Sequence, residues 1–405
     1  MATRERMRRY PEAHLPLTLR LLVRAADRLH YGKLELVSPD RGHWRFEGRR
    51  PGPSARLVLR NPAALGRVLR GGDVAFAEAY MDGDWDTPDL AELLELLHLN
   101  RQAFDGLAAG RLLARLGRLA SHLRRRNTRR GSRRNIAYHY DLGNAFYAAW
   151  LDPTLTYSCA LFERQDEHLE QAQRNKYDRM LRRLDIHPGQ HLLEIGSGWG
   201  GFAIHAAAAA GCRVTSITLS ERQFEEARKR VRAAGLEQLV ELRLQDYRDV
   251  TECYDRVVSI EMFEAVGEQY WPDFFRTIHD RLRPGGIAAL QVITIADAAF
   301  ADYRRGVDFI QKYIFPGGML CSPAAFATCV KAAGLLQNDR QFFGEHYART
   351  LAEWDRRVFA AGPDLRAQGF DNRFLRMWHY YLAYCQAGFR TGHVDLMQTT
   401  LVRPA

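Results

Sequence analysis

The sequence predicts an α/β protein with a doubly wound, mostly parallel sheet, preceded by a small N-terminal α+β domain. Three observations support this prediction. A short apolar strand runs into a glycine-rich turn and then a helical pattern over residues 191–210. Strand and helix patterns alternate after that turn, whereas residues 1–123 combine short strands with leucine-rich helices. With 405 residues, 46% of them hydrophobic, the chain is long enough to bury two cores.

The composition of the chain indicates which cellular compartment and which binding partners to expect. The net charge of +10 favours an anionic partner, either a membrane surface or a nucleic acid, although an arginine-rich protein with no such partner has the same charge. No run of 18 apolar residues occurs, and the N-terminus lacks the apolar segment of a secretory signal. The six cysteines contain no C-x-x-C pair, so we expect neither a zinc site nor a disulfide framework. We expect a cytoplasmic protein without metal ligands.

The N-terminal domain is predicted over residues 1–123, as a lipid- or membrane-associating unit. Residues 1–30 have the pattern of a basic amphipathic helix. Short alternating runs broken by proline and glycine over residues 31–60 indicate strands, and helices are predicted at 62–70, 73–81 and 88–122.

An arginine-rich linker is predicted at residues 124–134, where seven of eleven residues are arginine. Such a charge run is either a solvated linker or a linker that also contacts lipid phosphates, with each arginine near an anionic leaflet worth about 1 kcal/mol. Nucleic acid is the weaker alternative, because the run contains no interleaved aromatic residues. We therefore expect peripheral binding to the inner face of the plasma membrane and no nucleic-acid partner.

The second domain is predicted over residues 135–405. The predicted strands are 190–195, 213–218, 239–244, 255–260, 286–295, 335–343 and 393–402. The predicted helices are 220–234, 271–282, 322–333 and 371–389. The last helix and strand fit an antiparallel edge of the sheet.

The glycine-rich turn at residues 194–201 fits two kinds of site. Its G-x-G-x-x-G spacing is that of a dinucleotide site, which would also need an acid at the end of the next strand to bind the ribose hydroxyls. That strand ends in Thr218, and the acid lies before the glycines, at Glu194. This arrangement favours S-adenosylmethionine over a dinucleotide.

Further motifs in the second domain make a resemblance specific. They occupy residues 137–144 with 155–162, 218–223, 259–267 and 311–318. Together with the glycine turn, they resemble the family of cyclopropane-fatty-acyl-phospholipid synthases and mycolic acid cyclopropane synthases, and the N-terminal domain resembles that of the longer, phospholipid-acting members. The resemblance implies a class I methyltransferase fold with a Rossmann-like, mostly parallel seven-stranded sheet. It also admits a homodimer.

The activity that the resemblance implies is alkylation of a carbon–carbon double bond in unsaturated phospholipid acyl chains. An alkene is a weak nucleophile, so it must meet a sulfonium methyl group at close range in a dry pocket. Aromatic faces can stabilise the resulting carbocation. A base then removes a proton, and similar enzymes hold bicarbonate for that step. Cyclopropane formation is the leading prediction; the alternative is a methyl- or methylene-branched chain without ring closure. A third hypothesis is a non-catalytic lipid-binding or RNA-modifying protein on the same fold.

The resemblance also implies the catalytic residues. It places the bicarbonate cradle at Cys159, Glu264, Gln291, Ile293 and Tyr347. Two positions depart from the family pattern: Gln291 stands where histidine is usual, and Glu261 where glycine is common. Glutamine can donate a hydrogen bond to an anion, but it does not titrate near neutral pH.

The cofactor site follows from the same resemblance. The residues implied are Tyr157 and Ser158 near the methionine end; Glu194, Gly196, Ser197, Gly198, Trp199 and Gly200 in the turn; Thr218, Leu219 and Gln223 around the ribose; and Tyr247 beside the adenine. From its position alone, Asp246 is predicted to reach an adenine amine. An aromatic group has the best claim to line an acyl tunnel, although its spacing also fits an ordinary core: Tyr303, Phe309, Tyr313 and Phe315.

Overall fold

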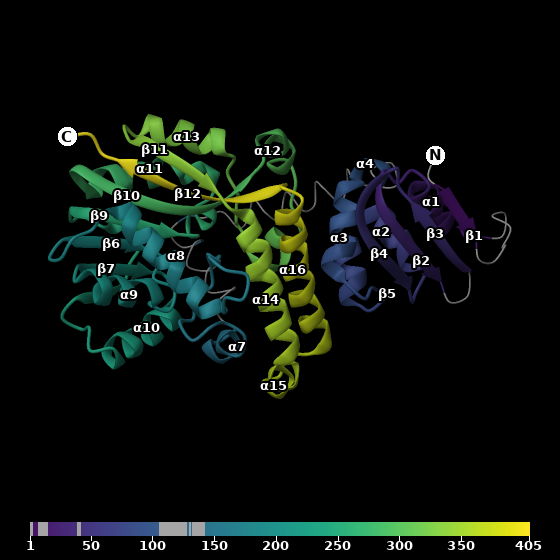
Figure 1. Ribbon diagram of the computed structural model, residues 1–405, viewed down its shortest axis with the longest axis horizontal. Helices are drawn as coiled ribbons and strands as arrows, with labels where there is room; N and C mark the ends of the chain where they lie inside the picture. The colour runs from purple at the N-terminus through teal and green to yellow at the C-terminus, as the bar shows by residue number, and fades with distance from the viewer. Residues whose placement is uncertain (1–2, 7–14, 39–41, 105–127, 129–130, 132–141) are drawn as a thin grey trace.

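The structure is a computed structural model that describes residues 3–6, 15–38, 42–104, 128, 131 and 142–405. Figure 1 shows two parts, each built on its own sheet, with the N-terminus in one and the C-terminus in the other. Most of the arginine-rich linker and the start of the motif at 137–144 lie outside the described residues. The predicted contact between that linker and lipid therefore stays a prediction.

The N-terminal part is a five-stranded sheet in the order β1-β3-β2-β4-β5, with helices packed against it. Its strands are β1 (Thr3–Arg6), β2 (Tyr31–Ser38), β3 (Gly42–Glu47), β4 (Arg50–Leu59) and β5 (Trp85–Asp86). Its helices are α1 (Leu17–Ala26), α2 (Ala64–Met81), α3 (Leu90–Leu99) and α4 (Arg101–Phe104). Strands β2 and β4 are parallel, and the other pairs are antiparallel.

One prediction in this part needs correction, and another is confirmed. The predicted helix 1–30 is wrong at its start, because residues 3–6 pair with β3 as a strand and the helix begins only at Leu17, after Pro16. The predicted helices 62–70 and 73–81 form the two arms of α2, which bends at Gly72. Gly72 has φ +65°, a conformation that glycine adopts without steric cost.

The C-terminal part is the predicted seven-stranded, mostly parallel sheet. Its order is β11-β12-β10-β9-β6-β7-β8, and only β12 runs antiparallel to its neighbours. The strands are β6 (His191–Ile195), β7 (Arg213–Thr218), β8 (Val240–Leu244), β9 (Tyr254–Ile260), β10 (Leu282–Ile295), β11 (Leu336–Phe342) and β12 (Val394–Val402). All seven predicted strands are present, and β10 begins four residues earlier than predicted because Leu282 already pairs with β9.

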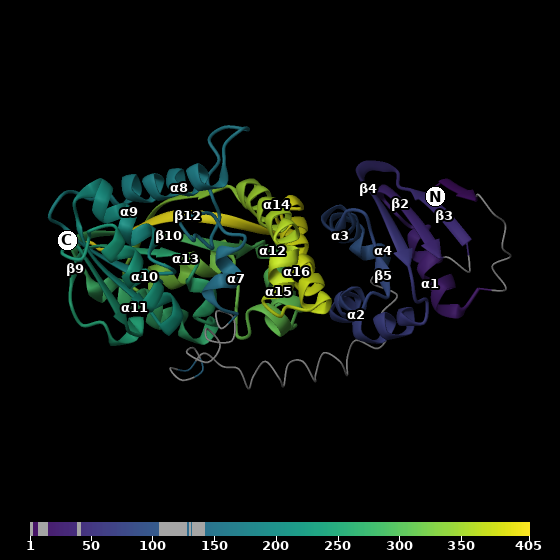
Figure 2. The ribbon, with the colours of Figure 1, turned by 90° about the horizontal axis from the view of Figure 1, so that it is seen from below.

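Helices cover both faces of this sheet (Figure 2). One apolar layer contains side chains of α8, α9 and α10, and the opposite layer contains side chains of α11 and α13. The helices are α7 (Asn144–Ala148), α8 (Leu169–Leu184), α9 (Gly201–Ala210), α10 (Glu221–Ala233), α11 (Trp271–Arg281), α12 (Asp297–Tyr303), α13 (Pro323–Ala332), α14 (Gly344–Ala360), α15 (Gly362–Ala367) and α16 (Asn372–Arg390). Short helical turns are η3 (Tyr247–Asp249), η4 (Phe263–Ala265), η5 (Glu268–Tyr270) and η6 (Ile310–Ile314).

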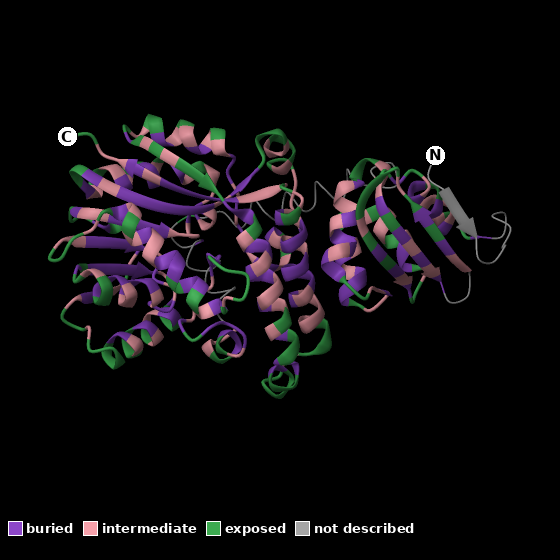
Figure 3. Ribbon diagram, in the orientation of Figure 1, coloured by how far each residue is buried: buried purple, intermediate pink, exposed green. Residues whose placement is uncertain are grey.

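Local sequence signals explain where several helices begin. The side chains of Asp89, Ser220, Ser322 and Asp371 each accept a hydrogen bond from a backbone N–H in the first turn of α3, α10, α13 and α16. The central strands β6 and β10 are largely buried, whereas the edge strand β11 is mostly exposed (Figure 3). This burial pattern is the one expected of a sheet with helices on both faces.

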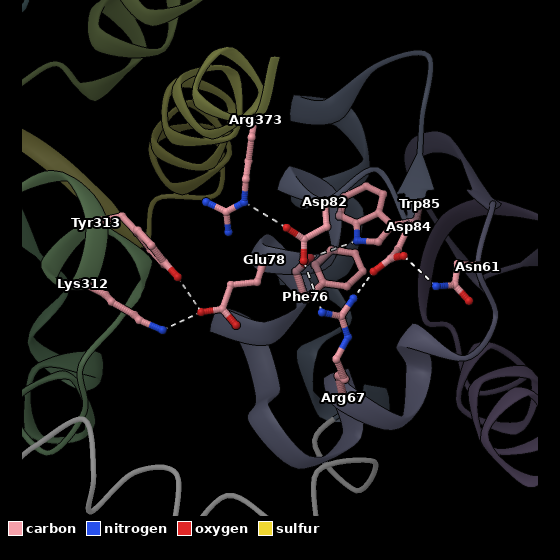
Figure 4. A network of polar contacts seen from close by, with 10 residues as sticks. All are labelled: Asn61, Arg67, Phe76, Glu78, Asp82, Asp84, Trp85, Lys312, Tyr313 and Arg373. Carbon is pink, nitrogen blue, oxygen red and sulfur yellow. Dashed lines mark hydrogen bonds and ion pairs between the residues drawn. The ribbon is translucent and has the colours of Figure 1, made fainter. Parts of the chain in front are cut away.

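The two parts meet along α16, which packs against α2 and α3. Polar contacts support this junction, as Figure 4 shows. The Glu78 carboxylate accepts hydrogen bonds from Lys312 and from the hydroxyl of Tyr313, the latter at 2.6 Å. Arg373 donates to Asp82 at 3.0 Å. The N-terminal part is therefore tied to the segment around η6 and to α16.

Two features are absent from the part of the chain that the structure describes. No helix there is long and apolar enough to cross a bilayer. No group of three or more His, Cys, Asp and Glu side chains there is arranged to hold a metal ion.

Candidate active site

The glycine turn after β6 has a backbone that only glycine adopts without strain. Gly196, Gly198 and Gly200 have φ of +104°, +50° and +82°. The helix α9 starts directly afterwards, so its first N–H groups have no partner within the helix. Such a turn lets the backbone approach a ligand closely and presents donors to it.

Contacts behind the turn hold it in place. A Cβ atom at Gly201 would lie 2.6 Å from the Tyr177 hydroxyl oxygen, so glycine is required there for packing. One nitrogen of Arg230 donates to the carbonyls of Thr154 and Trp199 at 2.8 and 2.7 Å, which links the turn to the loop before Tyr157. Sequence reasoning missed Arg230 and Tyr177, because each lies in a helix where its residue type is unremarkable.

Most of the predicted cofactor residues line one cavity of about 920 Å³. They are Tyr157, Ser158, Glu194, Gly196, Ser197, Gly198, Trp199, Thr218, Leu219, Gln223 and Tyr247. Gly200 and Asp246 are not among the lining residues, and Arg248 binds both carboxylate oxygens of Asp246 at 2.9 and 2.6 Å. A contact between Asp246 and adenine therefore stays a prediction.

The residues present fit S-adenosylmethionine. Burial raises the pKa of Glu194 to about 8, and the Ser216 hydroxyl donates to its carboxylate at 2.5 Å. A carboxyl group in this position can pair with hydroxyl or amine donors of a nucleoside. Thr218 and Gln223, bonded to each other at 3.0 Å, lie at the end of β7 and the start of α10. The turn, the acid and these polar side chains all face the same cavity.

The predicted anion cradle is assembled, but a side chain of the protein occupies it. The backbone N–H of Cys159 and the side-chain amide of Gln291 donate to Oε1 of Glu261 at 2.9 and 2.7 Å. The Tyr347 hydroxyl donates to Oε2 of Glu261 at 2.6 Å. Glu264 accepts a hydrogen bond from the backbone N–H of Ile293 at 2.6 Å. The structure therefore brings all five predicted cradle residues together around Glu261.

The backbone at Glu261 is unusual for a residue with a side chain. It has φ +50°, in the left-handed region that costs an L-residue roughly 1–2 kcal/mol. Its N–H donates to the carbonyl of Gln291 at 2.8 Å, which extends the pairing of β9 and β10 past Ile260. Strain of this kind is typical of functional sites.

A second glutamine fixes the orientation of Gln291. Gln291 and Gln398 lie opposite each other on β10 and β12, and the Gln398 amide donates to Oε1 of Gln291 at 2.8 Å. The NH₂ group of Gln291 therefore faces Glu261. Sequence reasoning did not single out Gln398, because only the pairing of two strands more than 100 residues apart reveals its role.

Burial dominates the electrostatics of the cradle. It raises the pKa of Glu261, and it raises the pKa of Glu264 to about 8, with the nearby charge of Glu261 as a second cause. Burial lowers the pKa of Lys176 to about 8, and its ammonium group donates to the Ser158 hydroxyl at 2.8 Å. The Cys159 thiol has its pKa raised by burial and stays protonated, so this residue contributes its backbone N–H and not a nucleophile.

The same cavity extends into the N-terminal part. Its lining there is mainly apolar: Leu22, Leu57, Leu65, Val68, Leu69, Phe76, Leu94, Leu97 and Phe104. Of the aromatic group expected along an acyl tunnel, Tyr303 and Phe315 line the cavity. Phe309 packs in the core against Tyr380, and Tyr313 binds Glu78 at the junction of the two parts.

Comparisons with known proteins show which family the chain is similar to. A family model described as Mycolic acid cyclopropane synthetase matches residues 127–399. The chain is 43% identical to tuberculostearic acid methyltransferase UfaA1 of Mycobacterium tuberculosis, over 86% of this chain and 83% of that protein. It is 33% identical to cyclopropane-fatty-acyl-phospholipid synthase of Escherichia coli K12, over 86% and 88%. The solved structure of mycolic acid cyclopropane synthase CmaA1, complexed with SAH and CTAB, matches with a TM-score of 0.63 and 33% identity, covering 67% of this chain and 98% of that one.

Proposed function

The chain belongs to the mycolic acid cyclopropane synthetase family of S-adenosylmethionine-dependent, lipid-modifying enzymes, and we propose that it methylates the double bond of unsaturated phospholipid acyl chains. The observation that carries this proposal is the shared cavity. One continuous space joins the glycine turn to the anion cradle and to the apolar side chains of the N-terminal part. Its volume of about 920 Å³ is near the upper end of the range, about 300–1,000 Å³, of typical ligand pockets.

The residues around the cavity support chemistry on an alkene. S-adenosylmethionine, when bound, supplies an electrophilic methyl group whose bonding electrons stay with its sulfur. Apolar lining excludes water from the acyl chain that receives this methyl group. Three aromatic rings line the cavity close to one another, with the Tyr157 and Tyr381 hydroxyls 2.8 Å apart and Phe315 stacked near Tyr157. Their faces can stabilise a carbocation on the chain.

The product that we propose is a branched acyl chain, not a ring. Ring formation was the leading prediction from the family resemblance, which also implied a bicarbonate cradle, and here Glu261 takes up the donors of that cradle. The relative that is 43% identical carries the name of a methyltransferase. Methyl transfer, a 1,2-hydride shift within the acyl chain and loss of a proton give a methylene branch with no further reactant, so this is the product we expect from the isolated enzyme.

We also propose that the enzyme meets its substrate at an anionic membrane surface on the cytoplasmic side. The net charge of +10 and the arginines at 124–134 support this proposal. Co-sedimentation with vesicles tests it: binding should require anionic lipid and should weaken at high salt. Equal binding to neutral and anionic vesicles would contradict it.

Incubation with methyl-labelled S-adenosylmethionine and vesicles of unsaturated phospholipid tests the activity. Label should enter the acyl chains, and vesicles of saturated phospholipid should stay unlabelled. Because ring and methylene products have the same mass, proton NMR of the released chains must distinguish them. Olefinic methylene signals would support the branched product, upfield cyclopropane signals would support the ring, and unlabelled lipid would refute the proposed function.

A further inference from the structure

The cradle that the resemblance assigned to bicarbonate does not fit that ion in this chain. Each of the three donors from Cys159, Gln291 and Tyr347 is directed at a carboxylate oxygen of Glu261. The remaining cradle atom, Oε2 of Glu264, is buried and has no hydrogen-bond partner. A bicarbonate ion there would lie beside the Glu261 carboxylate without the donors that an anion needs.

We propose that the carboxylate of Glu261 is the resident anion of the cradle and the proton acceptor of the reaction, so that this enzyme works without bicarbonate. Glu261 lines the cavity, and its two oxygens are oriented by three donors from three separate segments of the chain. The proposal rests on the proposed function, because it needs a carbocation from which a proton is lost.

The two departures from the family pattern support this assignment because they touch each other. Gln291, in place of histidine, donates its amide to Glu261, in place of glycine, at 2.7 Å. The amide is held in that orientation by Gln398, so it acts only as a donor to the carboxylate. The neutral amide of Gln291 therefore supplies a donor directly to the carboxylate of Glu261.

The backbone conformation of residue 261 also supports the assignment of Glu261 as the resident anion. At φ +50°, residue 261 has a conformation that suits glycine, and the glutamate side chain is held there despite the strain. Strain that persists in a buried cradle is compensated by the contacts of the side chain. The substitution Glu261→Gly should therefore leave the backbone intact while it empties the cradle.

The proton balance is complete with this residue alone. The π electrons of the alkene form the bond to the incoming methyl carbon, and the other alkene carbon becomes cationic. A 1,2-hydride shift then moves the cation onto the carbon that carries the new methyl group. Loss of a proton from that methyl group to the carboxylate of Glu261 leaves the C–H electron pair as the π bond of the methylene branch. The neighbouring Glu264, with a pKa of about 8, is protonated at neutral pH, which leaves the negative charge on Glu261.

The test compares the full-length enzyme with Glu261→Gly and Glu261→Gln in buffer depleted of carbon dioxide, with and without added bicarbonate. Wild-type activity should not respond to bicarbonate. Both variants should lose about 100-fold or more of the rate, the scale of a general base. Bicarbonate should restore activity to Glu261→Gly, whose cradle is empty, and not to Glu261→Gln, whose side chain still fills it. Glu268→Gln, which removes a surface carboxylate paired with Arg304 outside the cavity, is the matched control and should behave as wild type.

A binding measurement separates this proposal from the proposed function. Carbon-13-labelled bicarbonate, observed by NMR, should bind Glu261→Gly and not the wild type, whatever the acyl substrate proves to be. Bicarbonate-dependent activity or binding in the wild type would overturn the proposal. So would a Glu261→Gly variant that fails to bind bicarbonate, or one that binds it and stays inactive. If neither the wild type nor any variant methylated lipid, while bicarbonate bound Glu261→Gly and not the wild type, the proposed function and the role of Glu261 as proton acceptor would both be refuted. The conclusion that the Glu261 carboxylate occupies the cradle in place of bicarbonate would still hold.

Discussion

Replacing Tyr347 by phenylalanine should move the pH dependence of catalysis toward higher pH. The Tyr347 hydroxyl donates to Oε2 of Glu261 at 2.6 Å, and burial keeps the pKa of this tyrosine well above its ordinary value, so the hydroxyl stays a donor. A donor stabilises the ionised form of a carboxyl group and lowers its pKa. Without it, Glu261 should hold its proton up to a higher pH.

The expected size follows from the hydrogen bond that is lost. A hydrogen bond to a charged group contributes about 1.5–3 kcal/mol, which corresponds to a shift of roughly 1–2 units in the pKa of Glu261. The acid limb of kcat against pH should move upward by the same amount. On that limb the variant should be about 10- to 100-fold slower than the wild type at a given pH.

The assay is release of labelled methyl product between pH 5 and pH 9 at saturating substrate. Tyr313→Phe is the matched control, because it removes a tyrosine hydroxyl that also donates to a glutamate at 2.6 Å, but at the junction of the two parts (Figure 4). The control should keep the wild-type acid limb. If Tyr347→Phe also kept it, while binding S-adenosylhomocysteine normally, then Glu261 would not be the group that must be ionised.

Three further predictions follow from other contacts. Glu264 has a pKa of about 8 in the folded protein and 4.5 in the unfolded chain, so the folded protein loses stability as the pH rises from 4.5 to 8. In the variant Glu264→Gln, the urea midpoint should therefore fall less between pH 5 and pH 8 than it does in the wild type. Arg376→Ala removes the donor to the backbone carbonyls of Tyr80 and Trp85 in the N-terminal part and should lower the free energy of unfolding by about 1–3 kcal/mol. Arg373→Ala is the control, because it breaks an exposed ion pair worth about 0–1 kcal/mol. Thermal unfolding of the two variants measures the difference. Gly201→Ala places a Cβ atom 2.6 Å from the Tyr177 hydroxyl oxygen and should weaken the binding of S-adenosylhomocysteine about tenfold or more, as measured by calorimetry. Gly66→Ala is the control and should leave this binding unchanged, because its Cβ atom would meet no atom closer than 3.9 Å.

Local patterns were sufficient to predict the seven strands of the C-terminal part, whereas helices α8 and α14 were not predicted. The inner strands β6, β7 and β9 contain short apolar runs, and α10, α11 and α16 have an amphipathic period, so these elements can be recognised within a window of about ten residues. The glycine turn could also be predicted from the sequence, because a turn with positive φ at three positions needs glycine at each of them. Gly196, Gly198 and Gly200 adopt such φ values in the structure. The N-terminal strand Thr3–Arg6 was missed because its charged residues have no strand-like alternation and it forms only by pairing with β3.

The sequence by itself determined the class of fold and the cofactor, because these depend on local periodicity and on ordered motifs. The residues around the reacting centre were predicted from the family resemblance, and their roles stay predictions. Only the tertiary structure decided what occupies that centre. Glu261 meets Cys159 and Tyr347 across separations of 102 and 86 residues, and Gln291 is oriented by Gln398 on a neighbouring strand. Such contacts are set by how strands and helices pack together, and no spacing along the chain encodes which of several nearby side chains fills a shared cavity.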